Sequence, residues 1–81
     1  MTVHVRLFAI VRERAGVSSL LLKLPEGASV ATARDSLVQQ FPALREHVGR
    51  CAYAVNQSYV KPDASLRDGD ELALIPPVSG G

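Results

Sequence analysis

The side chains that could carry covalent or metal chemistry are few: His4, His47 and Cys51. They stand at no metal-binding spacing, such as Cys-x-x-Cys or His-x-x-x-His, so we expect no metal site. A nucleophilic cysteine needs a neighbouring base that lowers its pKa, whereas Cys51 opens an apolar stretch typical of a buried strand. We expect His4 to face solvent or a partner. These residues do not make an active site, and we expect no enzyme activity from the chain on its own.

The acidic residues Asp68, Asp70 and Glu71 form a second place where chemistry could occur. Their spacing lacks the oxygen-ligand periodicity of a calcium loop, and the dipeptide Asp68-Gly69 is typical of a turn. We interpret them as a solvated turn. The chain also lacks a glycine-rich phosphate loop, so we expect no bound cofactor.

The C-terminal hexapeptide PPVSGG, residues 76–81, has the most unusual composition in the chain. Pro76 and Pro77 lack a backbone N–H, cannot extend a sheet as interior residues and favour an extended conformation. The Ser-Gly-Gly end carries almost no side chain, so it fits a narrow channel and leaves the carboxylate of Gly81 approachable. The alternative is a disordered end that happens to finish in glycines.

The carboxylate of Gly81 would then be the functional group. It is a poor electrophile, because its negative charge repels nucleophiles. A partner that uses ATP could convert it to an acyl-adenylate, which a sulfur or nitrogen nucleophile could then attack. The tail therefore predicts a protein that presents its last carbonyl carbon to other catalysts.

The composition predicts a folded, soluble domain. The chain has 81 residues, of which 47% are hydrophobic and 21% charged, so one small globule is expected. Its nine basic and eight acidic residues are scattered and sum to +1, so we expect no nucleic-acid partner. A single cysteine excludes an intrachain disulfide framework and favours the cytoplasm. The charged N-terminus and the short apolar runs predict neither a targeting signal nor a membrane segment.

Alternation and helical spacing predict the elements. Residues 3–8 alternate as a strand, residues 9–16 form a helical turn that ends at Gly16, and residues 18–25 read as a second strand. An amphipathic helix is expected from the N-cap Ser29 to Phe41, with another helical turn before Gly49. Strands are expected at 51–56, 58–60 and 71–75.

This order predicts an α+β roll with one main helix packed on one face of a mixed sheet of about five strands. If the first and last strands are parallel neighbours, the arrangement is the ubiquitin-like β-grasp. We expect a β-grasp domain over residues 1–75 and an extended diglycine tail over residues 76–81.

Three stretches of the chain resemble the small subunit of molybdopterin synthase, the MoaD-like sulfur carriers. They are LFAIVRERAG near the start, AVNQSYV in the middle and LRDGDELALIPPVSGG at the end. The last stretch is the most specific: diglycine ends occur throughout ubiquitin-like proteins, whereas DGDE followed by a strand and PPVSGG is close to a signature of this subunit. Some relatives carry aromatic residues where this chain has Leu74 and Ile75.

The resemblance implies a role for the tail. Gly81 would be adenylated by an E1-like activating enzyme that uses ATP and magnesium, and a sulfur donor would convert it to a C-terminal thiocarboxylate. The tail would then enter the active site of the large synthase subunit and deliver sulfur to cyclic pyranopterin monophosphate, within a heterotetramer. The residues expected to enter partner active sites are Pro76, Pro77, Val78, Ser79 and Gly80.

A docking surface should accompany the tail. Phe8, Ala73 and Ile75 would point to the sheet face opposite the helix if the first and last strands are neighbours, and exposed apolar clusters mark partner sites. We therefore expect these residues to bind the large subunit, Phe8 and Ile75 as anchors. The alternative is ordinary packing against loops.

Three other functions stay open at this point. The thiocarboxylate could serve thiamine, cysteine or thiolated-tRNA biosynthesis instead. The chain could be a ubiquitin-like modifier that forms isopeptide bonds with lysines. It could also be a non-reactive β-grasp binding module, for which removal of Gly80 and Gly81 would be harmless.

Overall fold

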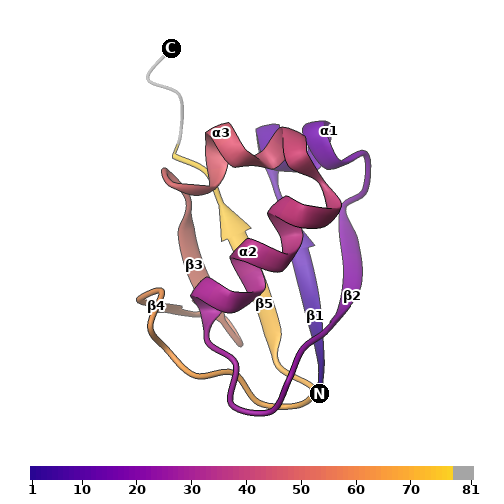
Figure 1. The fold of residues 1–81 in the computed structure, drawn as a ribbon. Helices are drawn as coiled ribbons and strands as arrows, with labels where there is room; N and C mark the ends of the chain where they lie inside the picture. The colour runs from indigo at the N-terminus through magenta and orange to yellow at the C-terminus, as the bar shows by residue number, and fades with distance from the viewer. Residues whose placement is uncertain (78–81) are drawn as a thin grey trace.

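The computed structural model of the chain describes residues 1–77 and shows a sheet crossed on one face by a helix (Figure 1). The strands and helices follow one another in the order predicted from the sequence. In chain order they are β1 (Thr2–Leu7), α1 (Ala9–Ala15), β2 (Ser19–Lys23), α2 (Val30–Gln40), the 3-10 helix η1 (Pro42–Leu44), α3 (Arg45–Val48), β3 (Ala52–Val55), β4 (Ser58–Val60) and β5 (Glu71–Ile75).

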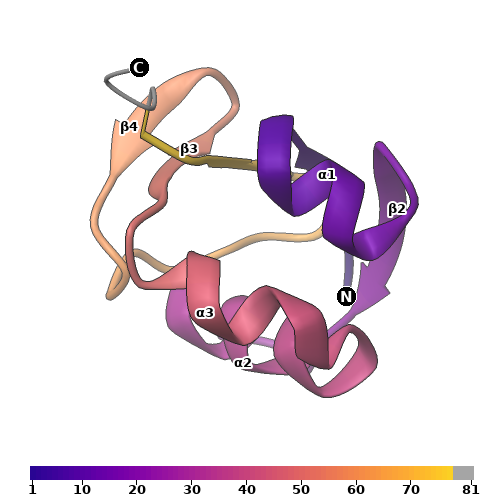
Figure 2. The same ribbon diagram turned by 90° about the horizontal axis from the view of Figure 1, so that it is seen from above.

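The sheet has the strand order β2-β1-β5-β3-β4. β1 and β5 are parallel neighbours, whereas β2 pairs antiparallel with β1, and β3 pairs antiparallel with both β5 and β4. The predicted parallel pairing of the first and last strands is therefore confirmed, and so is the β-grasp fold. Viewed from above, α2 and α3 lie on one side of the sheet and α1 closes one end (Figure 2).

The core lies between the sheet and α2. Alternate residues of β1 and β5 are almost completely buried on the side of the sheet that faces α2. Val30, Ala33 and Leu37 of α2 cover them. Burying each leucine contributes roughly 1.5–3 kcal/mol, so these strands hold the domain together. The buried strand residues are Val3, Val5, Leu7, Leu72 and Leu74.

The ends of the two longer helices follow the sequence signals. The Ser29 hydroxyl accepts a hydrogen bond from the Thr32 N–H at 3.2 Å and caps α2, as predicted. Gly16 ends α1 with a φ of +79°, in the left-handed region that glycine adopts without strain. The strand expected from Cys51 begins one residue later, because the Cys51 N–H is bound to the Val48 carbonyl in a turn.

The acidic turn is more ordered than the sequence predicted. Asp70 accepts a hydrogen bond from the Asn56 side-chain amide at 2.9 Å, and the Asn56 side-chain oxygen accepts one from the Glu71 N–H at 3.0 Å. Asp68 accepts from the Thr2 N–H at 2.7 Å. The β3–β4 turn and the start of β1 are thus both tied to the start of β5.

None of the helices within residues 1–77 has the length and apolar character needed to cross a bilayer.

Candidate functional site: the tail root and the open sheet face

The predicted tail begins where the sheet ends. β5 ends at Ile75, and Pro76 and Pro77, here called the tail root, belong to no strand or helix. Pro76 is half-buried and Pro77 is exposed. The other predicted tail residues lie outside the described part of the chain: Val78, Ser79, Gly80 and Gly81.

The tail root leaves from a well-held strand. β5 is hydrogen-bonded to β1 on one side and to β3 on the other. Leu72 and Leu74 are completely buried beneath it. A central strand with such packing opens only with the domain as a whole, so the origin of the tail has a fixed position and direction. The strand runs toward the end of the sheet where α1 and α3 lie (Figure 1).

The structure brings the predicted docking residues together. The ladder pairs Leu7 with Leu74, so that Phe8 and Ile75, which follow them, are neighbours on the opposite side of the sheet. Ala73 lies two residues before Ile75 on the same side. All three side chains are half-buried rather than fully exposed. They belong to the sheet face away from α2, here called the open face, with His4, Arg6, Ser19, Leu21, Ala52, Ala54, Tyr59 and Glu71.

Tyr59 is a further docking candidate, which the sequence pattern did not indicate. Its side chain is 75% exposed on β4, and the register pairs it with Ala54, which in turn pairs with Ala73. Because the side chains of Ala54 and Ala73 are short, they form a shallow depression between Tyr59 and the Phe8–Ile75 pair. Alternation within the short strand Ser58–Val60 already separates Tyr59 from its neighbours, but only the sheet order places it across Ala54 from Ala73.

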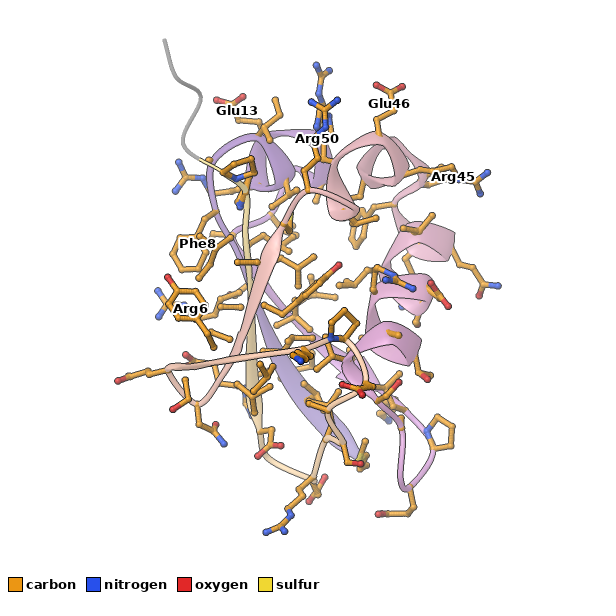
Figure 3. The ribbon with its side chains drawn as sticks, turned by 90° about the vertical axis from the view of Figure 1, so that its left-hand side faces the viewer. Arg6, Phe8, Glu13, Arg45, Glu46 and Arg50 are labelled. Carbon is orange, nitrogen blue, oxygen red and sulfur yellow. The ribbon has the colours of Figure 1, made fainter. Side chains whose placement is uncertain are left out.

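Arg6 lies next to these apolar residues. Its guanidinium carbon is 5.3 Å from the centre of the Phe8 ring, and its Nη1 is 3.9 Å from a carboxylate oxygen of Glu71. Figure 3 shows Arg6 and Phe8 together on one side of the molecule, with Arg45 on the other. The open face therefore has an apolar part near the tail root and a charged part farther along the strands.

A cavity of about 420 Å³ lies on the other side of the tail root. Ile10 from α1, Pro76 and Pro77 form apolar walls, and His47 and Arg50 contribute polar ones. The tail root is thus flanked by two surfaces, this cavity and the open face.

Conventional catalytic groups do not converge in the part of the chain that the structure describes. The Cys51 thiol donates a hydrogen bond to the backbone carbonyl of His47 at 3.4 Å, so the imidazole is not its partner. Loss of hydration raises the pKa of the Cys51 thiol, which lowers its reactivity at neutral pH. Burial likewise raises the pKa of Tyr53, whose hydroxyl donates to the Val48 carbonyl at 2.9 Å. Within residues 1–77, no three His, Cys, Asp or Glu side chains gather as metal ligands.

Comparison with known proteins agrees with this geometry. The sequence is 43% identical over 79 residues to a molybdopterin synthase sulfur carrier subunit of Arabidopsis thaliana, covering 98% of this chain and 82% of that protein. The fold matches SAMP1 from Haloferax volcanii with a TM-score of 0.92 and 32% identity, covering both chains completely. It also matches a chain in the complex of subunits 1 and 2 of the Helicobacter pylori molybdopterin-converting factor, with a TM-score of 0.73 and 32% identity over both full chains. The sequence model of the ThiS family matches residues 5–81, and this chain therefore belongs to the ThiS family.

Proposed function

We propose that this protein is the sulfur carrier subunit of a molybdopterin synthase. The observation that carries the proposal is the position of the tail root, at the end of the central strand β5 and beside the apolar part of the open face. The full-length similarity to a sulfur carrier subunit of that enzyme supports the same function. A rigid origin and an adjacent docking surface are what a carrier needs in order to place its last residue inside another protein.

The chemistry occurs at the Gly81 carboxyl group. An activating enzyme of the E1 type uses ATP and magnesium to form an acyl-adenylate, which replaces a repelling negative charge by a good leaving group. Sulfur delivered by a donor at the oxidation level of hydrosulfide then attacks the carbonyl carbon and expels AMP, which leaves a thiocarboxylate. The thiocarboxylate is a better nucleophile than the carboxylate, and its sulfur forms a bond to a carbon of cyclic pyranopterin monophosphate in the large subunit. Water then cleaves the resulting thioester, which leaves the sulfur on the substrate and returns the Gly81 carboxylate.

The surface of the folded domain determines which partner proteins the tail reaches. Phe8, Ala73 and Ile75 contact the large subunit, and the exposed ring of Tyr59 extends the same surface. The groups that bind and orient the substrate belong to the large subunit, so this chain supplies sulfur and does not catalyse the reaction alone. The matched complex of subunits 1 and 2 from Helicobacter pylori supports a two-subunit assembly. We place the protein in the cytoplasm.

Intact-mass spectrometry tests this function directly. The chain is incubated with ATP, magnesium, an activating enzyme and a sulfur source. The expected gain in mass corresponds to the replacement of one oxygen by one sulfur. The sulfur-loaded protein should then convert cyclic pyranopterin monophosphate when mixed with the large subunit. A chain that lacks Gly80 and Gly81 serves as the control and should gain no mass. Conversion of a thiamine, cysteine or tRNA precursor instead would assign the carrier to another pathway.

One observation favours a second function, that of a ubiquitin-like modifier. The fold matches a small archaeal modifier protein 1 of Haloferax volcanii with a TM-score of 0.89 and 30% identity. A modifier would leave Gly-Gly remnants on lysines of target proteins after protease digestion. Proteomic detection of such remnants, lost when Gly81 is removed, would support this second function.

A further inference from the structure

We infer that the large subunit places a carboxylate side chain against Arg6 of the open face, and that this contact selects the cognate partner. The inference rests on the proposed function, because it assumes that the large subunit docks on this face. It adds a charged contact to an interface whose predicted residues, Phe8, Ala73 and Ile75, are all apolar.

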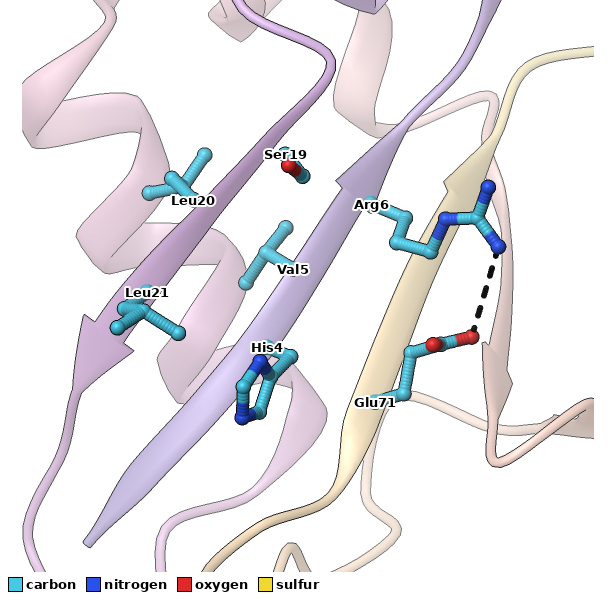
Figure 4. Close-up of a pocket in the computed structure, with 7 residues that line it drawn as sticks. All are labelled: His4, Val5, Arg6, Ser19, Leu20, Leu21 and Glu71. Carbon is cyan, nitrogen blue, oxygen red and sulfur yellow. Dashed lines mark ion pairs between the residues drawn. The ribbon is translucent and has the colours of Figure 1, made fainter.

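Arg6 lies within the open face, where a partner that covers Phe8 and Ala73 would meet it. The β1–β5 ladder pairs Arg6 directly with Ala73, and Ala73 pairs with Ala54 on the next strand. The side chain of Arg6 extends from β1 across β5 (Figure 4). The side chains of Ala73 and Ala54 are too short to cover the Arg6 guanidinium. It therefore stays accessible on the open face, beside the Phe8 ring.

The hydrogen-bonding capacity of this guanidinium is mostly unused. Its contact with Glu71 joins one nitrogen to one oxygen at 3.9 Å, and the two side chains are 53% and 40% exposed. Such a surface pair is weak. A guanidinium carries five N–H donors and binds a carboxylate best through two parallel hydrogen bonds. Arg6 therefore has donors free for a second carboxylate.

The residues around Arg6 indicate which other side chains the partner presents. A groove of about 340 Å³ runs beside it, lined on the open face by His4, Ser19, Leu21 and Glu71. Leu21 is 62% exposed and forms an apolar wall (Figure 4). The complementary segment thus carries an apolar side chain for Leu21 and an acidic side chain for Arg6.

Docking without such a carboxylate would be unfavourable. An interface that covers Phe8 and Ala73 also removes water from Arg6, and a desolvated charge without a partner is strongly destabilising. The 3.9 Å contact with Glu71 compensates only part of the hydration that the Arg6 guanidinium loses. A partner that lacks an acidic residue at this place is consequently rejected, which gives specificity to an otherwise apolar surface.

Binding measurements with the large subunit from the same organism test the inference. Arg6→Gln should weaken the complex by at least ~10-fold, and Arg6→Lys should weaken it less because it keeps the charge but loses the planar fork. Glu71→Gln should strengthen binding, since it removes a negative charge that repels the partner's carboxylate. Arg45→Gln, an exposed arginine on the helix side, is the matched control and should bind as the unchanged protein does.

The outcomes separate this inference from the proposed function. Failure of the unchanged protein to bind any molybdopterin synthase large subunit would contradict the function itself. Tight binding of the unchanged protein and of Arg6→Gln alike would overturn only the role of Arg6. Weaker binding of Glu71→Gln, with Arg6→Gln unaffected, would show that the partner presents a basic group instead. Circular dichroism of each variant checks that the exposed substitutions leave the fold intact.

Discussion

Leu7 pairs with Leu74 across the parallel ladder between β1 and β5, and both side chains are buried against the core. This pairing determines the geometry of the site. It sets Phe8 beside Ile75 on the open face, and it fixes the strand end from which the tail root leaves. The core thereby positions both the docking surface and the tail.

Truncating the buried Leu74 side chain of β5 should destabilise the domain. Leu74→Ala removes a completely buried side chain and leaves a cavity, so we expect the free energy of unfolding to fall by about 2–5 kcal/mol. Urea denaturation followed by circular dichroism measures this change. Leu21→Ala, at an exposed leucine of β2, is the control and should change stability by less than ~0.5 kcal/mol. Equal effects of the two substitutions would contradict the packing described for β5.

A charge on the apolar part of the open face should break docking without unfolding the chain. Phe8→Asp is expected to weaken binding to the large subunit by at least ~10-fold, because a carboxylate would be desolvated in the interface. Calorimetric titration measures the affinity, and circular dichroism measures the fold. Val17→Asp, at an exposed apolar residue outside the open face, should leave the affinity unchanged. An unfolded Phe8→Asp variant would refute the surface assignment.

The hydrogen bonds around Asn56 should stabilise the start of β5. Asn56→Asp keeps the side-chain shape but replaces the donor to Asp70 by a second negative charge, so we expect a loss of about 0.5–1.5 kcal/mol in the free energy of unfolding. The double variant Asn56→Asp with Asp70→Asn reverses donor and acceptor and should recover most of that loss. A denaturation series on the three variants measures both values. Absence of recovery in the double variant would show that the pair does not interact.

Cys51 should take no part in sulfur transfer. Cys51→Ala is expected to gain the same mass as the unchanged chain when charged with sulfur, since its thiol is half-buried and contacts only a backbone carbonyl on its polar side. Because burial raises the pKa of the native thiol, iodoacetamide should react more slowly with the folded chain than with the unfolded one.

The same raised pKa gives a pH dependence. The free energy of unfolding should not depend on this thiol below its ordinary pKa, where both states keep the proton, and should fall as the pH rises through the raised native value. Cys51→Ala should lack this alkaline loss. A Cys51→Ala variant that cannot be charged with sulfur would instead give the thiol a functional role.

The main elements of the fold were predictable from the sequence because each has a local cause. Alternation identifies β1 and β5, the cap Ser29 marks the start of α2, and Gly16 ends α1. The β-grasp order follows if the first and last strands are parallel neighbours, as the structure shows. The elements themselves, unlike the pairing of β1 with β5, depend on residues close together in the chain.

The rest of the site depends on register between distant residues. Tyr59 joins the docking surface only because β4 pairs with β3 and β3 with β5, so that two alanines separate it from Arg6. The contact of Asn56 with Asp70 joins residues 14 positions apart. No local pattern distinguishes that arrangement from an ordinary solvated turn.

The central claim is that sulfur is carried by the Gly81 carboxyl group, and fragmentation mass spectrometry of the charged protein tests it most directly. The chain and a variant with one alanine added after Gly81 are incubated side by side with activating enzyme, ATP, magnesium and a sulfur source. We predict that the unchanged chain exchanges one oxygen for sulfur at its last residue, whereas the untrimmed extended variant gains nothing and supports no cofactor synthesis. Sulfur found on Cys51, or an extended variant of full activity that has not been trimmed, would contradict the account.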